Sequence, residues 1–301
     1  MTKAELDSIK ILPLEDSWYR KVKEKLDGIA KPLDGLGKFE HLIAQIGAIE
    51  KTTKISIQKK AVLVMCADNG VVEEQVSQSG KEVTLAVAKA MGVNNSSVGK
   101  MAAVAGVDVI PVDIGIDTDE VIPGVLPRKV AKGTKNFAKE PAMTEEEVLK
   151  AIETGIQLVQ QCHREGYEIL ATGEMGIGNT TTSTAVAAAL LDLEVEQVTG
   201  KGAGLTDEAL KRKCRVIKEA IEKYSLRDAD AFTILKTVGG LDIAGLTGVF
   251  IGAAIEQIPV VIDGVISAVA ALLAETLCKG AVNYMIPSHK SRELAETAIM
   301  K

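Results

Sequence analysis

The run from Gly173 to Thr182 is the part of this sequence whose residue types and spacing best suit chemistry, because it combines three glycines with three consecutive threonines. It follows the apolar segment 168–171 and precedes an alanine-rich stretch, 183–191. The pattern therefore predicts a strand, a glycine turn and the start of a helix. Backbone N–H groups and the positive end of the helix dipole converge at such a turn, which suits a phosphate or another anion.

The glycine spacing leaves the ligand of this turn open. It fits neither the lysine-containing phosphate loop nor the three-glycine dinucleotide fingerprint. A mononucleotide or sugar-phosphate cradle and a tight turn that binds nothing are both compatible with the spacing alone. We expect a phosphate beside Gly176, Gly178, Asn179 and Thr180. Glu174 lies between two glycines and should face the ligand; because a carboxylate repels phosphate, a sugar or a base is its better partner.

Aspartates follow three of the predicted strands, at Asp68, Asp113 and Asp263. An aspartate at such a place either orients a ligand or caps a turn. For Asp68, which precedes Asn69 and a glycine, turn propensity favours the cap. Three strands that end in the same residue type are harder to ascribe to turn chemistry alone, so these positions stay candidates for ligand contact.

Four near-continuous apolar runs read as strands buried on both faces, and helical patterns separate them. The runs are 61–66, 107–112, 168–171 and 259–262. This alternation predicts an α/β fold with a doubly wound, mostly parallel sheet and ligands at the carboxyl ends of its strands.

The domain organisation follows from the same patterns. Residues 14–52 are helical in pattern, and the stretch 117–136 reads as a long surface connection. We predict a small helical lobe from residues 1–55, completed by 285–301, and an α/β nucleotide-binding domain from 56–284.

Composition excludes several classes of protein. A net charge of −6 without a basic, aromatic-rich stripe argues against nucleic-acid binding. The N-terminus lacks an apolar signal core, and the longest apolar runs are interrupted before they reach membrane-spanning length. The four cysteines are far apart and the histidines lack ligand spacing, so we predict a cytoplasmic protein with reduced thiols, no metal and no cofactor.

Long blocks in a fixed order give the chain a family resemblance along nearly its whole length. It resembles the nicotinate-nucleotide:dimethylbenzimidazole phosphoribosyltransferases of cobamide lower-ligand assembly. The blocks are Lys31 to Glu40, Ala67 to Val71 with Val76-Ser77 and Glu82 to Thr84, Val112 to Gly115, Gly133 to Asn136 with Pro141 to Thr144, Gly173 to Thr182, Gly202 to Leu205, Val238 to Ala244, and Val261 to Gly264.

The resemblance implies transfer of the phosphoribosyl group from nicotinate mononucleotide to the nitrogen of a benzimidazole-like base, with inversion at the anomeric carbon. The nicotinate ring of the donor already carries a positive charge and becomes neutral when it leaves. The reaction therefore needs little acid help and no metal. The protein must hold the phosphate, shield an oxocarbenium-like transition state and take a proton from the attacking base. Members of the family form dimers, so the resemblance also implies a homodimer or a heterodimer with a homologous subunit.

Three further site residues come from the resemblance. Lys213 on its own is compatible with a solvated helix face, whereas the resemblance implies contact with phosphate. Ser291 lies where the family has a phosphate-proximal serine, and locally it also suits the cap of a helix that begins near Leu294. Gly202 begins the segment Gly202-Ala203-Gly204, which stands in place of the family's glycine-threonine-glycine motif.

The sequence also departs from the family pattern. Asn69 stands in place of a usual histidine, Gln75 in place of a glycine and Gly80 in place of a proline. We expect this region to line the pocket for the aromatic base, so the acceptor is predicted to differ and a phenolic acceptor becomes plausible.

The family's general base is a glutamate in a Gly-Glu-Gly motif beyond the Ser-His block, and the sequence given ends at Lys301 without it. One hypothesis is an active phosphoribosyltransferase; the other is a non-catalytic paralogue that serves as partner subunit of an active one. Glu174 is the only obvious substitute base, and its expected direction is toward the ribose. We therefore expect residues 1–301 alone to be weak or inactive.

Overall fold

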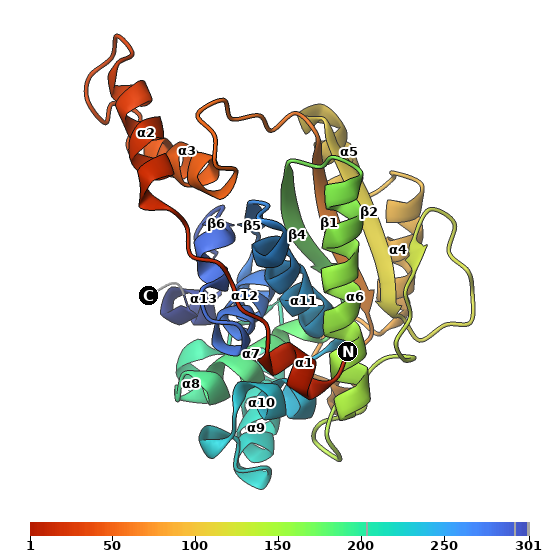
Figure 1. Cartoon of the computed structure of the whole chain (residues 1–301). Helices are drawn as coiled ribbons and strands as arrows, with labels where there is room; N and C mark the ends of the chain where they lie inside the picture. Colours follow the sequence, from red (N-terminus) through yellow and green to blue (C-terminus); the bar gives the residue numbers. More distant parts are fainter. Residues whose placement is uncertain (203, 292, 300–301) are drawn as a thin grey trace.

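A six-stranded parallel sheet forms the centre of the computed structural model, which describes residues 1–202, 204–291 and 293–299 (Figure 1). The strand order is β3-β2-β1-β4-β5-β6. The first strand, β1, therefore lies inside the sheet. Strands β2 and β3 are added on one side of it, and β4, β5 and β6 follow on the other side. The crevice beyond the carboxyl ends of β1 and β4 is the switch point at which sheets of this kind bind ligands. The strands are β1 (Lys60–Ala67), β2 (Val107–Gly115), β3 (Leu126–Pro127), β4 (Ile169–Met175), β5 (Val260–Ile262) and β6 (Met285–Pro287).

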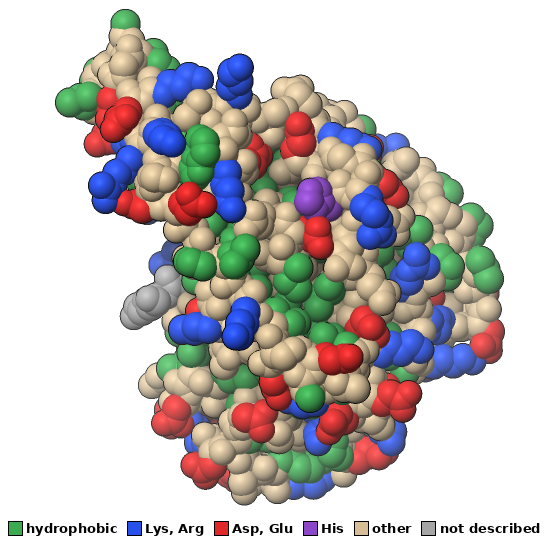
Figure 2. Space-filling view, viewed as in Figure 1, with side chains coloured by type: hydrophobic (Ala, Val, Ile, Leu, Met, Phe, Trp, Pro, Cys, Tyr) green, Lys and Arg blue, Asp and Glu red, His purple; other side chains and the backbone are tan. Residues whose placement is uncertain are grey.

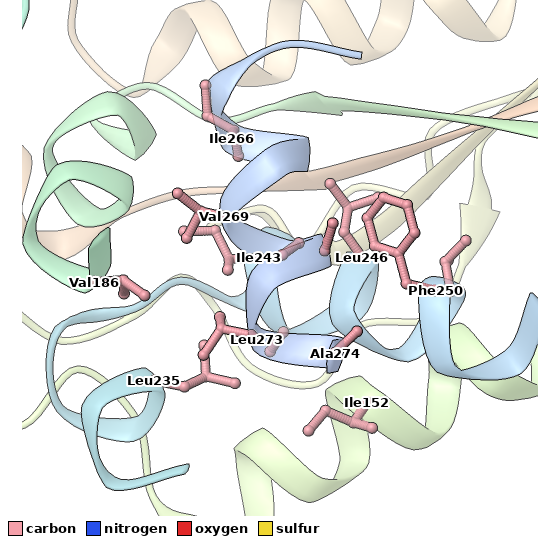
Figure 3. Packing of buried hydrophobic residues seen from close by; sticks show 14 of the residues in the cluster. Ile152, Val186, Leu235, Ile243, Leu246, Phe250, Ile266, Val269, Leu273 and Ala274 are labelled. Carbon is pink, nitrogen blue, oxygen red and sulfur yellow. The ribbon is translucent and has the colours of Figure 1, made fainter. Parts of the chain in front are cut away.

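Alternate residues of β1 enter two different layers, as the pleat of a strand requires. Leu63 and Met65 belong to the main core, together with side chains of α6 (Glu145–Arg164), α7 (Asn179–Leu190), α11 (Leu241–Glu256) and α12 (Val265–Leu277). Figure 3 shows part of this core, where Ile152, Leu246, Phe250 and Leu273 lie among neighbouring helices. Val62 and Val64 face the other way, toward α4 (Glu82–Gly92) and α5 (Ser97–Ala105).

Helices α6 and α11 approach each other more closely than side chains would allow. A Cβ atom on Gly155 would lie 2.1 Å from the carbonyl oxygen of Gly245, and one on Gly248 would lie 2.0 Å from that of Ile152. Glycines at the contact therefore set the separation of the two helices. This packing fixes the position of α11, whose first turn lies next to the switch point.

Helices α2 (Asp16–Asp27) and α3 (Lys38–Ile49) pack against each other and project from the body of the molecule (Figure 1). The buried Glu40 carboxylate holds this lobe together through ion pairs with Lys23 at 2.9 Å and Lys31 at 2.7 Å. Residues 1–14 lie on the body instead. Leu6 of α1 (Lys3–Asp7) belongs to the main core, and the Tyr284 hydroxyl donates to the Leu12 carbonyl at 2.8 Å.

The predicted α/β fold with a parallel sheet flanked by helices is confirmed, and the four predicted strands correspond to β1, β2, β4 and β5. The sequence did not reveal β3 and β6, which have two and three residues. The segment 285–301 was expected to complete the helical lobe. In the structure β6 is an edge strand paired with β5, and α13 (Leu294–Ile299) packs against α7, α8 and α12. Residues 300–301 lie outside the described part.

The remaining elements connect these layers. They are α8 (Val195–Val198), α9 (Asp207–Lys223), α10 (Ala231–Val238) and the short 3-10 helices η1 (Gly70–Glu74), η2 (Leu226–Asp228) and η3 (Ala281–Tyr284). On the face seen in Figure 2, basic and acidic side chains are interspersed over the surface. Within the described residues, none of the helices combines the length and the apolar character needed to span a membrane.

Candidate active site

The glycine turn after β4 presents backbone amides at the switch point. Gly178 is the N-cap of α7 with φ of 93°, and a Cβ atom there would lie 2.7 Å from the Val72 side chain. The Ile177 amide donates to the Thr84 hydroxyl at 3.1 Å, and the Asn179 amide donates to the Gly176 carbonyl at 3.1 Å. Among the hydrogen bonds of the described residues, the amides of Gly178 and Thr180 have no acceptor. These two N–H groups are therefore available to an anion at the helix start.

A small pocket of about 80 Å³ adjoins this turn. Its volume is roughly that of two or three water molecules, so it suits a compact group. The side-chain amide of Gln78 donates to the Gly204 carbonyl and so connects the two segments that flank the pocket. The lining residues are Val76, Ser77, Gln78, Gly176, Ile177, Gly178, Asn179, Thr180, Lys201, Gly202 and Leu205.

Lys213 of α9 lies directly behind this pocket and is fully buried. Its ammonium donates to the Thr180 hydroxyl at 2.9 Å and to the Gly200 carbonyl at 3.4 Å. Burial lowers the pKa of Lys213 to about 8, although the nearby Glu293 carboxylate favours the charged form. Because a buried ammonium gains most from a charged partner, an anion in the pocket would stabilise the charged lysine.

A larger cavity of about 600 Å³ lies on the other face of the sheet, between β1, β4 and the helices α4 and α5. Aliphatic and thioether side chains form most of its wall, which suits a flat aromatic ring. Its lining residues are Val62, Val64, Val87, Met91, Ser96, Ser97, Val98, Met101, Ala102, Ala105, Val107, Ala171, Thr172, Gly173, Glu174, Met175, Val261, Asp263 and Ser288.

Glu174 and Asn179 connect the two hollows. Glu174 lines the apolar cavity, whereas Asn179 lines the small pocket. The Asn179 side-chain amide donates to the Glu174 carboxyl and also to the Asp242 carboxyl, the latter at 3.2 Å. Burial and, after it, the neighbouring Asp242 charge raise the pKa of Glu174 to about 8. Burial also raises the pKa of Asp242, to about 6. A carboxyl with such a pKa can exchange a proton near neutral pH.

Comparison with known proteins agrees with this geometry. A family model described as "Phosphoribosyltransferase" matches residues 11–301. The chain belongs to this phosphoribosyltransferase family. It is 46% identical over 280 residues to the nicotinate-nucleotide–dimethylbenzimidazole phosphoribosyltransferase of Acetivibrio thermocellus, a match that covers 93% of this chain and 80% of the relative. The enzyme of that name from Clostridium perfringens (strain 13 / Type A) is 44% identical over 288 residues, which cover 96% of this chain and 80% of the relative.

Solved phosphoribosyltransferase structures share the fold. The crystal structure of CobT from Thermus thermophilus superposes with a TM-score of 0.90 at 32% identity, over 94% of this chain and 85% of that one. A structure named for the nicotinate-nucleotide–dimethylbenzimidazole phosphoribosyltransferase of the same organism gives a TM-score of 0.89 at 31% identity, over 95% and 86%.

The structure brings most of the predicted phosphoribosyltransferase site residues together. Gly176, Gly178, Asn179, Thr180 and Gly202 all line the small pocket, with Lys213 immediately behind them. Glu174 and Asp263 line the apolar cavity. Ala203, inside the Gly202–Gly204 motif, lies outside the described residues.

Besides Lys213 and Asn69, two predicted site residues line neither hollow, Ser291 and Asp68. The Ser291 hydroxyl accepts from the Glu293 amide at 3.0 Å, and the Ser291 amide donates to the Glu296 carboxylate at 2.9 Å. Ser291 thus makes local hydrogen bonds next to the start of α13, although its hydroxyl does not accept from an amide of the helix itself. Asp68 is buried and accepts from the Asp117 amide at 2.8 Å, so it connects the end of β1 to the segment after β2 and does not cap its own turn.

The family departures lie apart from the apolar cavity. Asn69, Gln75 and Gly80 do not line the apolar cavity. Asn69 lies beneath the glycine turn and donates to the Ile177 carbonyl at 3.3 Å, while the Gln75 carbonyl accepts from Arg212 at 3.3 Å. These substitutions therefore border the small pocket rather than the cavity.

Sequence reasoning missed two kinds of functional residue in this phosphoribosyltransferase. The walls of the cavity, such as Met91 and Met101, have the sequence pattern of ordinary helix faces and carried no signal. Asp242 had a signal that was not used, because it follows Gly239 and Gly240 at the start of an apolar helical stretch. A carboxylate at a glycine-preceded helix start is a candidate for a buried, fixed charge.

Proposed function

We propose that this chain transfers the phosphoribosyl group of nicotinate mononucleotide to a benzimidazole-like base and so makes an α-ribotide for cobamide biosynthesis. The observation that carries the proposal is the meeting of a compact anion pocket and a large apolar cavity at one carboxyl, Glu174. A donor with a phosphate at one end and an acceptor that is an apolar ring need this combination. The names of the relatives support the same substrates.

The donor phosphate occupies the small pocket in this proposal. The free amides of Gly178 and Thr180 bind its oxygens, and the Lys213 ammonium compensates its charge through Thr180. The ribose then extends toward Glu174, whose carboxyl lies five residues before the helix start. Binding of the phosphate at one end places the anomeric carbon at the mouth of the cavity, next to the bound acceptor.

The transfer step exchanges one C–N bond for another. The acceptor nitrogen uses its lone pair to form a bond to the anomeric carbon, and the bond to the nicotinate nitrogen breaks with its electron pair remaining on nicotinate. Attack from the opposite face inverts the anomeric centre. The N–H proton of the acceptor must leave, and we assign its removal to Glu174, because this carboxyl lines the acceptor cavity and its raised pKa suits a base near pH 8.

The composition of the cavity wall supports a broad acceptor class. Methionine side chains adapt to rings of different outline, and hydroxyls of Ser96, Ser97 and Thr172 offer few fixed hydrogen bonds. We propose that benzimidazoles bind here and that a phenol enters the same cavity and reacts through its oxygen. A non-catalytic partner subunit is not favoured, because the chain retains the anion pocket, the buried lysine and the cavity carboxyl.

We propose a dimer, with a second copy or a homologous subunit, in the cytoplasm. Exposed apolar side chains on and beside the α2–α3 lobe, namely Ile29, Leu33, Leu36 and Phe39, support an interface there. All four cysteines are free thiols, as expected in a reducing compartment.

Incubation of the purified protein with nicotinate mononucleotide and a panel of benzimidazoles, purines and phenols tests the proposed function. We expect release of nicotinate together with a ribotide of the acceptor, identified by mass spectrometry. The assay is run with the chain alone and with a co-expressed homologue. No transfer to any acceptor under either condition would overturn the proposal.

A further inference from the structure

A fully buried carboxyl, Asp242, lies behind Glu174 and has no assigned purpose in the transfer described above. It is the second residue of α11, and its side chain is 0% exposed. One of its oxygens accepts from the Ile243 amide at 3.0 Å. The other accepts from the Asn179 side-chain amide at 3.2 Å, and the same amide group donates to Glu174. A single carboxamide thus joins the fully buried Asp242 carboxyl to the partly buried Glu174 carboxyl.

The surroundings of the two carboxyls differ. Asp242 lies at the start of a helix, where amide N–H groups and the helix dipole stabilise a negative charge. Glu174 lies on an apolar cavity wall and has the Asn179 amide as its hydrogen-bond donor. When two carboxyls share a site, the one in the better-stabilised position ionises first and the other retains a high affinity for its proton.

Among the described residues, the other titratable groups that act most strongly on this pair are acids and a thiol. They are Asp263 after β5, Asp68 after β1 and the Cys66 thiol of β1. The charge of Asp242 is therefore not cancelled from these sides, and it acts on Glu174 across one amide group. Asn179, whose two N–H bonds are both used on carboxyls, cannot rotate without losing one of them.

We propose that Asp242 is a positioning residue, which through Asn179 holds the Glu174 carboxyl toward the acceptor cavity and by its own charge makes Glu174 a stronger proton acceptor. This inference rests on the proposed function for its catalytic meaning. The arrangement of Asp242, Asn179 and Glu174 is a carboxyl–amide–carboxyl bridge between the start of α11 and the glycine turn.

The variant Asp242→Asn tests the proposal, because it removes the charge and keeps one acceptor oxygen for the Ile243 amide, while the NH2 group that replaces the other oxygen can no longer accept from Asn179. We expect the acid limb of the kcat profile to move to lower pH by about one unit or more. The KM for nicotinate mononucleotide should stay within about threefold, since ground-state binding is not altered. Asp113→Asn is the matched control, because Asp113 is another buried strand-end carboxyl and lines neither the small pocket nor the apolar cavity. It should leave the pH profile unchanged.

The double variant Glu174→Gln/Asp242→Asn separates positioning from a structural effect. If Asp242 acts through Glu174, the double variant has the same kcat as Glu174→Gln alone; additive losses would overturn the proposal. Should Asp242→Asn fail to fold, Asp242→Ser retains a helix-capping oxygen without the charge and takes its place.

A titration that needs no turnover distinguishes this inference from the proposed function. The ¹³C resonance of the Glu174 carboxyl, assigned by comparison with Glu174→Gln, should titrate about one unit or more lower in Asp242→Asn than in the natural protein. An unchanged midpoint would refute the positioning inference even in an active enzyme. A wild-type protein without transfer activity that still shows the shift would refute the proposed function alone.

Discussion

The small pocket and the apolar cavity of the site differ in the chemical groups that form them. The small pocket is formed around the backbone amides of the glycine turn by three short segments near Ser77, Gly178 and Gly202, with one buried lysine behind it. The apolar cavity is formed by side chains of β1, β4, α4 and α5, which are far apart in the sequence. The first binds by fixed donors and charge, and the second by shape and apolar contact. Variants in the small pocket should therefore change donor binding strongly, whereas variants in the cavity wall should change acceptor choice mildly.

Glu174→Gln, at the junction of the two hollows, should have the largest effect. Loss of the proton acceptor should lower kcat by roughly 10²- to 10⁴-fold with a small change in either KM. Steady-state kinetics with nicotinate mononucleotide and dimethylbenzimidazole measure this. A loss below about threefold would show that the proton goes elsewhere and would return Glu174 to the ribose contact expected from its position between glycines.

The same variant should be more stable than the natural protein at pH 8. The pKa of Glu174 is raised to about 8 in the fold, so the folded chain binds more protons than the unfolded chain above the ordinary glutamate pKa. Stability from this group is therefore lost as the pH rises toward 8, and a neutral glutamine removes that loss. Melting curves at pH 5 and pH 8 should converge at the lower pH and separate at the higher one.

Lys213→Met should weaken donor binding by about 10- to 100-fold, because a charge-assisted contact near the phosphate is lost. Since the pKa of Lys213 is lowered to about 8, the natural protein should also lose donor affinity above that pH as the lysine becomes neutral. The variant should lack this dependence. The control is Lys218→Met on the exposed face of the same helix, and equal effects of the two variants would exclude Lys213 from the pocket.

Gly178→Ala should raise the donor KM by about tenfold, because the left-handed backbone and the Val72 side chain at 2.7 Å both oppose a Cβ atom. Gly166→Ala is a matched control with φ of 82° and no atom within 4 Å of the added carbon. It carries similar backbone strain away from the site, so it should lower the melting temperature and leave KM unchanged. A KM shift in both variants would mean that strain alone explains the result.

Met101→Ala should have the smallest effect, a change of about threefold in relative acceptor preference with the donor KM unchanged. Met101 lines the cavity although it is 73% exposed, so its truncation costs little stability. Val104→Ala on the same helix, 92% exposed and outside the cavity lining, is the control.

Asn69→His should disturb donor binding and leave the acceptor order intact, because Asn69 supports the glycine turn.

The difference between the two hollows also explains what the sequence could predict. The glycine turn was found because its strand, turn and helix start are consecutive and each has a local physical signature. The four long strands were found for the same reason. Short edge strands such as β6 depend on a neighbour for their hydrogen bonds and leave no periodic pattern.

The cavity could not be derived in this way, because its wall is assembled by tertiary packing. Val64 and Met91 are typical core residues in the sequence, and only the fold shows that they face a hollow.

A crystal structure of the protein with nicotinate mononucleotide and dimethylbenzimidazole bound to Glu174→Gln tests the central claim most directly. The account predicts phosphate oxygens within hydrogen-bond distance of the Gly178 and Thr180 amides, with the benzimidazole ring in the apolar cavity between α4, α5 and the sheet. The ribose should lie between them, beside residue 174. A phosphate bound away from the glycine turn, or a benzimidazole ring outside the cavity, would contradict it.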